Sequence, residues 1–93
     1  MAEGAEKAAS CMRALSNPSR LLILCNLMTG ERKVGELEEE LGLGQAYVSQ
    51  QLARLRAEGL VSARRDGRTV FYSLSDSRVK PIIEVLYAQF CET

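Results

Sequence analysis

The 93-residue chain contains no histidine, and this absence removes several kinds of chemistry at once. Histidine is the commonest general base, a member of the Ser-His-Asp and Cys-His constellations, and the commonest metal ligand. No phosphate-binding loop is visible either, because Gly42 and Gly44 lack the further glycines of a dinucleotide fingerprint. We therefore expect a protein that is not an enzyme and that uses no cofactor.

The chain also lacks a net charge, a long apolar run and a recognisable leader. Its 12 basic and 12 acidic residues cancel, so bulk charge gives no argument for nucleic-acid binding. No apolar run approaches the roughly 20 residues needed to span a membrane. The first residues, MAEGAEKAAS, show no basic segment leading into an apolar one. We expect a cytoplasmic protein with no membrane contact.

The length predicts a single domain over residues 1–93. A chain of this size buries only about 60–65% of its unfolded surface, so it gains stability by dimerising or binding. It has three cysteines, an odd number that cannot all be paired within one chain, and the expected compartment is reducing. This favours free or redox-active thiols over a disulfide framework.

The hydrophobic pattern predicts helices and one hairpin, in a fixed order. Apolar residues at helical spacing indicate helices, and alternating residues around Asp66-Gly67 indicate a β-hairpin. Asp76 is expected to cap the last helix. The predicted helices cover 2–15, 19–29, 31–41, 45–58 and 78 onward, and the predicted strands cover 60–65 and 68–74.

The order of these elements indicates a winged helix-turn-helix. The helices 31–41 and 45–58 are joined by the short turn Gly42-Leu43-Gly44, as in a helix-turn-helix. The hairpin follows directly and supplies the wing. We therefore predict a mostly α fold with a small β-hairpin, in which the helix 19–29 is apolar nearly all round and lies in the middle of the core.

The helix 45–58 has the residue types that suit contact with DNA. With Val48, Leu52 and Leu55 pointing inward, glutamine, serine and alanine side chains lie outward, and these suit base edges, phosphates and close approach to a groove. The outward and flanking candidates are Ala46, Tyr47, Ser49, Gln50 and Arg54.

The hairpin tip carries Arg64, Arg65 and Arg68, which can reach a phosphate backbone or a minor groove. Between residues 41 and 80 basic residues outnumber acidic ones by seven to three, and the acidic excess lies in 31–40. This segregation reconciles zero net charge with DNA binding. A helix pair or a basic loop alone is also common in proteins that touch no DNA, so a winged-helix protein-interaction module stays open.

The stretch 14–74 resembles the ArsR/SmtB family of small winged-helix repressors, most specifically in VSQQLARLRAEGLV followed by RRDGRTVFYSL. The resemblance implies a homodimer formed through the first and last helices. It implies binding to an imperfect palindrome of double-stranded DNA, with release when an inducer binds. By resemblance the DNA-reading positions are Gln45, Ala46, Ser49 and Gln50, with Arg64, Arg65 and Arg68 on the wing. Many relatives have histidine in place of Gln51 and serine in place of Ala46, and both differences are candidates for an altered operator preference.

The family's metal sites find no counterpart in this sequence. One kind uses a Cys-x-Cys pair at the start of the third helix, and residues 31–37 contain no cysteine. Another uses histidines on the last helix. Since zinc favours nitrogen and sulfur ligands, sensing of zinc, nickel or cobalt is disfavoured and no metal site is predicted.

The cysteines on the second and last helices, Cys25 and Cys91, are similar to those of the sulfide- and persulfide-responsive branch of the family. In that branch two such cysteines are joined by a polysulfide bridge within one subunit, and DNA affinity falls. The resemblance therefore implies a persulfide or sulfide-derived inducer. Cys11 is not part of that pattern.

Three alternatives for the thiols remain at this point. Cys25 could simply be a buried core residue. A general thiol-oxidation repressor would form a plain Cys25–Cys91 disulfide, which requires Cα atoms within about 7 Å. A trivalent arsenic sensor would use three thiolates, with Cys11 as the third.

Overall fold

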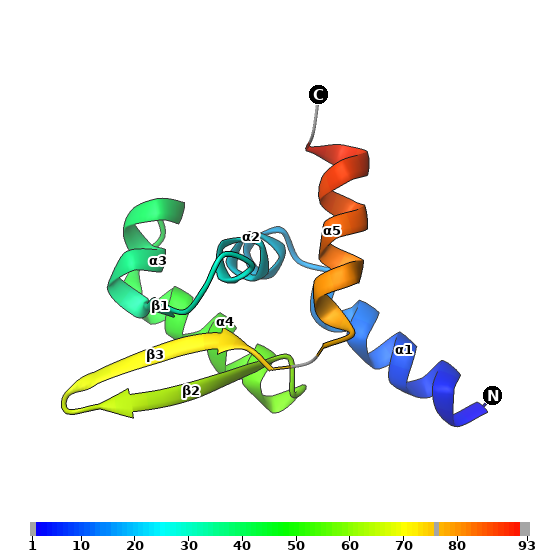
Figure 1. Cartoon of the computed structure of the whole chain (residues 1–93), viewed down its shortest axis with the longest axis horizontal. Helices are drawn as coiled ribbons and strands as arrows, with labels where there is room; N and C mark the ends of the chain where they lie inside the picture. The colour runs from blue at the N-terminus through cyan, green and yellow to red at the C-terminus, as the bar shows by residue number, and fades with distance from the viewer. Residues whose placement is uncertain (1, 76, 92–93) are drawn as a thin grey trace.

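The computed structural model describes residues 2–75 and 77–91, and it confirms the predicted winged helix-turn-helix (Figure 1). The predicted cap Asp76 lies outside the described residues. In chain order the elements are α1 (Ala2–Leu15), α2 (Pro18–Leu27), β1 (Arg32–Lys33), α3 (Val34–Leu41), α4 (Gln45–Ala57), β2 (Val61–Asp66), β3 (Thr69–Leu74) and α5 (Val79–Phe90).

The sheet has three antiparallel strands in the order β1-β3-β2, so the predicted two-stranded hairpin was incomplete. Arg32 and Lys33 pair with Tyr72 and Phe71 of β3, although we predicted them as helical. The helix begins only at Val34, because the Lys33 backbone N–H donates to the Glu36 side chain at 2.9 Å and closes a capping box. A two-residue edge strand leaves no periodic pattern to predict it by.

The predicted turn Asp66-Gly67 was wrong by one residue. Asp66 pairs with Thr69, so the two loop residues are Gly67 and Arg68. Gly67 has a φ of +63°, and no non-glycine residue in the described part of the chain has a positive φ. A positive φ at the first loop position alone is typical of a type II′ turn, which glycine adopts without strain. The shift places Arg68 in the loop itself.

The core is arranged around α2, as predicted. This helix packs against α1, α3, α4, α5 and β3 (Figure 1). Its Ile23 and Leu24 are fully buried. Leu27 of α2 is buried as well, and the other buried apolar side chains lie around this helix: Ala14, Leu15, Leu37, Val48, Leu52, Leu55, Leu60, Val61, Val79 and Ile83.

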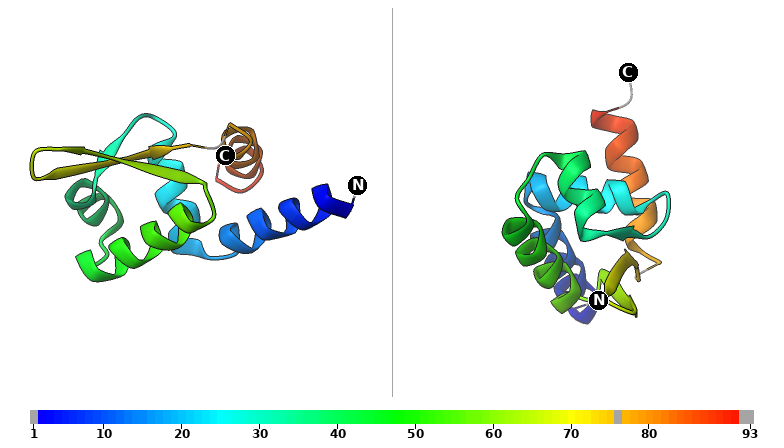
Figure 2. Two further views of the ribbon diagram at one scale, coloured as in Figure 1. Left: turned by 90° about the horizontal axis from the view of Figure 1, so that it is seen from below. Right: turned by 90° about the vertical axis from the view of Figure 1, so that its left-hand side faces the viewer.

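The two terminal helices extend from this core and leave apolar surface uncovered. In Figures 1 and 2, α1 runs outward from the body, and it buries only Ala14 and Leu15. Val85, Tyr87 and Phe90 of α5 remain exposed, the last of them at 80% of its surface. Over the described ranges, no helix is both long and apolar enough to cross a bilayer.

Candidate nucleic-acid interface and thiol pair

The second helix of the helix-turn-helix presents the predicted residues at the surface. Gly42 ends α3 with a φ of +67°, and Gly44 caps α4 in an extended conformation. On α4, Val48, Leu52 and Leu55 are buried, and the predicted contact residues are all exposed: Gln45, Ala46, Tyr47, Ser49, Gln50 and Arg54.

Two of these exposed side chains are already engaged within the chain. The Tyr47 hydroxyl donates to Ser19 Oγ at 3.2 Å. Arg54 Nε lies 3.7 Å from a carboxylate oxygen of Glu58, whose other oxygen accepts the Ser10 hydroxyl at 2.7 Å. Tyr47 therefore connects α4 to α2, and Glu58 connects the end of α4 to α1.

One polar contact behind α4 was not predicted from the sequence. Gln51 is 9% exposed and faces inward, where its Oε1 accepts a hydrogen bond from Arg20 at 3.0 Å. Arg20 also donates to the backbone oxygens of Ala14 and Arg13, at 2.6 and 3.3 Å. One guanidinium thus joins the end of α1 to α2 and α4. Gln51 therefore lies on the inner side of α4, away from the exposed residues that are expected to read bases.

The three wing arginines differ in their surroundings. Arg65 and Arg68 are exposed, and in the described part of the chain neither makes a side-chain hydrogen bond or ion pair. Arg64 is instead held by Glu31: its Nη2 lies 2.6 Å from one carboxylate oxygen, and its Nε lies 3.4 Å from the other. Its guanidinium also lies 4.6 Å from the centre of the Phe71 ring.

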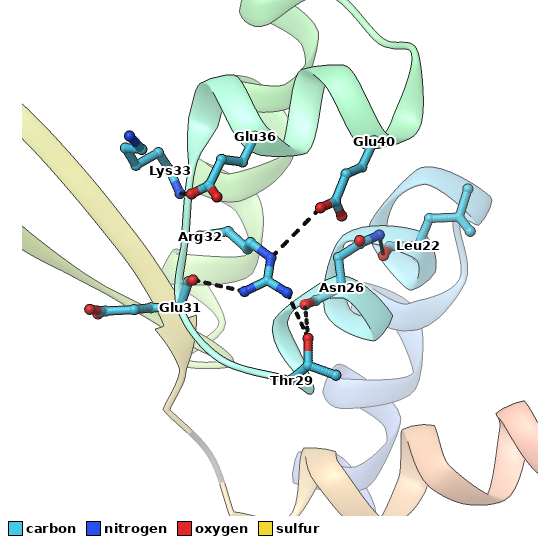
Figure 3. Close-up of polar contacts among 8 residues, drawn as sticks. All are labelled: Leu22, Asn26, Thr29, Glu31, Arg32, Lys33, Glu36 and Glu40. Atoms are coloured by element: carbon cyan, nitrogen blue, oxygen red, sulfur yellow. Dashed lines mark hydrogen bonds and ion pairs between the residues drawn. The ribbon is translucent and has the colours of Figure 1, made fainter.

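A second arginine fastens the loop between α2 and α3 (Figure 3). Arg32 donates to the Glu31 backbone oxygen at 3.1 Å and to the Thr29 hydroxyl at 2.7 Å. Its Nε lies 3.9 Å from a carboxylate oxygen of Glu40 on α3. Thr29 in turn donates to the backbone oxygen of Asn26, at the end of α2. The end of α2 is therefore connected to the first helix of the helix-turn-helix.

Two of the three cysteines meet in one apolar groove between α2 and α5. Cys25 is partly buried on α2, Cys91 is exposed at the end of α5, and they form no disulfide. Both line a groove of about 500 Å³ whose other walls are Pro18, Leu21, Leu22, Ile83, Leu86, Tyr87 and Phe90. Burial raises the pKa of the Cys25 thiol above its ordinary value of 9.0, and the charge of Cys91 raises this pKa further.

Cys11 lies elsewhere, in a different cavity lined also by Lys7, Glu58 and Arg78. Across residues 2–75 and 77–91, no group of three His, Cys, Asp or Glu side chains is placed to hold a metal ion. Within one subunit, the structure therefore brings together the predicted thiol pair but not three thiols.

Comparisons with known proteins agree with this architecture. Residues 17–63 match the family model described as bacterial regulatory protein, arsR family. The chain is 41% identical over 91 residues to the biofilm growth-associated repressor of Xylella fastidiosa, which covers 98% of this chain and 80% of that protein. It is 45% identical over 92 residues to the transcriptional activator HlyU of Vibrio cholerae, which covers 99% of this chain and 85% of that protein.

Solved structures show the same fold. Reduced HlyU from Vibrio cholerae superposes with a TM-score of 0.92 at 45% identity, covering 98% of this chain and 96% of that one. The repressor BigR from Xylella fastidiosa gives a TM-score of 0.92 at 40% identity, covering 100% and 95%. A homodimeric winged helix-turn-helix DNA-binding domain from Mycobacterium bovis gives 0.84 at 31% identity, covering 95% and 82%.

Proposed function

Since the chain belongs to the ArsR family of bacterial regulatory proteins, we propose that it is a transcriptional repressor switched by its thiol pair. Its named relatives are DNA-binding transcriptional regulators and not enzymes, and the chain is a regulator of that kind. In the proposed cycle, a reduced homodimer binds an imperfect palindrome of double-stranded DNA. It releases the DNA when sulfur bridges Cys25 and Cys91.

The proposed DNA surface consists of the outer face of α4 and the tip of the wing. Gln45, Ser49 and Gln50 are exposed near the start of α4, where amide and hydroxyl groups suit base edges. Arg65 and Arg68 supply positive charge at the wing tip, where it suits phosphates. Ala46 and the flanking Tyr47 and Arg54 complete the surface on α4.

A homodimer fits both the target and the exposed surface. Two α4 helices related by a two-fold axis would enter successive major grooves about 34 Å apart, which is why a palindrome suits a symmetric dimer. The exposed apolar side chains that could form this dimer include Met12 on α1 and Val85 on α5. The Mycobacterium bovis domain of the same fold is described as homodimeric.

The shared groove of Cys25 and Cys91 is the observation that carries the sensing proposal. Their different surroundings also suggest an order of reaction. Cys91 is exposed and open to an incoming persulfide, whereas Cys25 is partly buried and its raised pKa keeps it protonated near neutral pH. We therefore assign the first attack to Cys91 and the closing attack to Cys25.

The chemistry balances without a further oxidant. The Cys91 thiolate attacks the outer sulfur of a persulfide RSSH, so that an S–S bond forms at Cys91 and RS⁻ leaves and takes up a proton. A second RSSH adds one more sulfur in the same way. The Cys25 thiolate then attacks the middle sulfur and expels HS⁻. In total, two thiols and two RSSH give one trisulfide, two RSH and one H₂S.

With a single RSSH, attack of Cys25 on Cys91 Sγ would give a plain disulfide, one RSH and one H₂S. A plain disulfide is possible only if the Cα atoms lie within about 7 Å, whereas extra sulfur spans a longer gap. Selectivity for persulfide over peroxide therefore depends on how far apart the two thiols are held.

The position of α2 explains how a bridge could reach the DNA surface. A bridge would fasten α2 to α5, and α2 contacts both helices of the helix-turn-helix. Its first turn holds Gln51 of α4 through Arg20, and its end is connected to α3 through Arg32. Couplings between sites are typically about 1–3 kcal/mol, which corresponds to roughly 5–150-fold in DNA affinity.

The proposal is tested by mass spectrometry and DNA binding on the same samples. Reduced protein is treated separately with a persulfide donor and with peroxide. Cross-linked peptides are then identified, and the dissociation constant for operator DNA is measured by fluorescence anisotropy. We expect a Cys25–Cys91 cross-link with extra sulfur after the persulfide only, together with weaker DNA binding. Cys25→Ser and Cys91→Ser should abolish both effects, and Cys11→Ser is the matched control that should retain them.

Other outcomes would replace the proposal. A plain disulfide from both reagents, with loss of DNA binding, would indicate a general thiol-oxidation repressor. Release of DNA by arsenite that also requires Cys11 would indicate an arsenic sensor with a site shared between subunits. If the reduced protein binds no duplex, and none can be selected from a random pool, the chain would be better explained as a protein-interaction module. A reporter gene that loses expression without the protein would overturn repression, since HlyU is named an activator.

A further inference from the structure

Arg64 is set back from the tip of the wing and is built into the sheet. It pairs with Phe71 across the β2–β3 ladder, and the pairs Arg65–Val70 and Asp66–Thr69 separate it from the loop. Phe71 pairs in turn with Lys33 of β1. The Arg64 side chain therefore lies over a ring in the central strand and reaches Glu31 beside the far strand.

Three contacts use the guanidinium at the same time. Two of its nitrogens face the two oxygens of one carboxylate, in the forked arrangement that favours arginine over lysine. The Arg64 Cζ atom lies over the Phe71 ring, 4.6 Å from the ring centre. The ion pair also lowers the pKa of Glu31, mainly through the hydrogen bond from Arg64. The contact joins the wing to the segment that leads into α3.

We infer that Glu31 and Arg64 are positioning residues that set the angle of the wing, and that Arg65 and Arg68 are the wing arginines that contact phosphate. The inference rests on DNA binding by the proposed surface. Glu31 occupies the Nε–Nη2 edge of Arg64, and its negative charge beside the guanidinium opposes the approach of a phosphate. Arg65 and Arg68 are exposed and make no such contact within the described residues.

Replacing Glu31 by glutamine should change DNA affinity in the direction opposite to that expected from charge alone. Removing a negative charge from a DNA-binding protein ordinarily tightens binding. Glu31→Gln should instead weaken it, by about two- to fivefold, because the wing loses its anchor. Glu39→Gln is the matched control: Glu39 is an exposed carboxylate nearby in the sequence for which no hydrogen bond or ion pair is found in the described chain. This control should leave affinity unchanged or slightly tighter.

The salt dependence of binding separates an anchor from a phosphate contact. The slope of log K against log salt is negative, and losing one phosphate contact makes it shallower by about 1. We expect that reduction for Arg65→Gln and for Arg68→Gln, and no reduction for Arg64→Gln. Arg64→Lys is the decisive variant, because lysine binds phosphate but provides neither the fork nor the stacking. It should bind DNA as weakly as Arg64→Gln.

An NMR readout tests the same contact on the intact, reduced protein. The Arg64 Nε–H signal should be shifted by the Phe71 ring, should move in Glu31→Gln, and should stay in place when DNA is added. Tighter binding by Glu31→Gln, with a slope reduced by about 1 in Arg64→Gln, would overturn the inference and make Glu31 a competitor for the phosphate. If the wild type binds no DNA, the proposed function fails instead. The Arg64 signal in free protein then still reports whether the contact exists.

Discussion

Replacing Arg20 by alanine tests the contact that joins three helices. The guanidinium donates to the Ala14 and Arg13 backbone oxygens and to Gln51 Oε1, at 2.6, 3.3 and 3.0 Å. The two backbone oxygens belong to the last turn of α1, where carbonyls lack partners within the helix and a cation is favourable. Arg20→Ala removes these contacts together and leaves the Gln51 amide buried without its partner.

The cost can be set from these contacts. Hydrogen bonds to a charged group contribute about 1.5–3 kcal/mol, and leaving a buried polar group unpaired costs about 1–3 kcal/mol. Water can reach part of this site, so the terms do not simply add. We expect Arg20→Ala to lower the free energy of unfolding by about 2–4 kcal/mol. For a domain of this size, that corresponds to a fall in melting temperature of roughly 10–30 °C.

Urea unfolding at one fixed protein concentration provides the measurement, since the stability of the proposed homodimer would depend on concentration. The midpoint should fall while the slope m is unchanged. Arg13→Ala, on the exposed part of α1, should stay within about 0.5 kcal/mol of the wild type. The pair Arg20→Met with Gln51→Leu should recover only the part of the loss that comes from the unpaired Gln51 amide, because the Ala14 backbone oxygen still lacks its donor. A loss below about 1 kcal/mol for Arg20→Ala would refute this account of the contact.

Four further predictions follow from the same geometry. Gln50→Ala should change the preference among operator sequences, whereas Gln51→Leu should lower stability without changing that preference. Selection from random DNA measures the preference of each variant, and thermal unfolding measures its stability. Glu31→Gln should have a lower melting temperature than the wild type at neutral pH. This difference should shrink as the pH falls below the ordinary glutamate pKa of 4.5 and vanish below the lowered pKa of Glu31, because the wild-type carboxyl is then protonated and has lost its charge as well. Alkylation at pH 7–8 should label Cys91 before Cys25, and the Cys25 rate should go on rising above pH 9, where an ordinary thiol levels off, because burial disfavours its thiolate; equal rates at pH 7 would contradict this order. Gly67→Ala should destabilise the hairpin by about 1 kcal/mol through its positive φ, which thermal unfolding can measure.

Long periodic segments were predictable from the sequence because one signal fixed each of them. Helix α1 matches its prediction over residues 2–15, and the apolar run of α2 placed it in the core. The short features were not predictable. Strand β1 has two residues and is held by pairing with β3, which the local sequence does not report. The turn is displaced because its type depends on which single residue takes a positive φ.

The candidate site was also predictable only in part. Helical spacing predicted the exposed face of α4, since the side opposite Val48 and Leu52 must face outward. Resemblance supplied the pairing of Cys25 with Cys91, and only the fold brings α2 and α5 together around one groove. The partners of Arg64 and Gln51 lie 33 and 31 residues away in the chain, at distances over which periodicity carries no information.

Helix α2 holds Cys25, the proposed sensing thiol, and both connections to the proposed DNA surface begin at this helix, which limits how large a movement regulation needs. Arg20 and Cys25 lie five positions apart on α2, and the loop that contains Arg32 begins at its end. A tenfold loss of DNA affinity requires only about 1.4 kcal/mol, less than the expected worth of the Arg20 contacts alone. A sulfur bridge that weakened a fraction of these contacts would therefore be enough to release an operator, with the core of the domain left intact. Regulation and stability then draw on the same few hydrogen bonds, so variants at Arg20 should change both the affinity of the reduced protein and its response to persulfide.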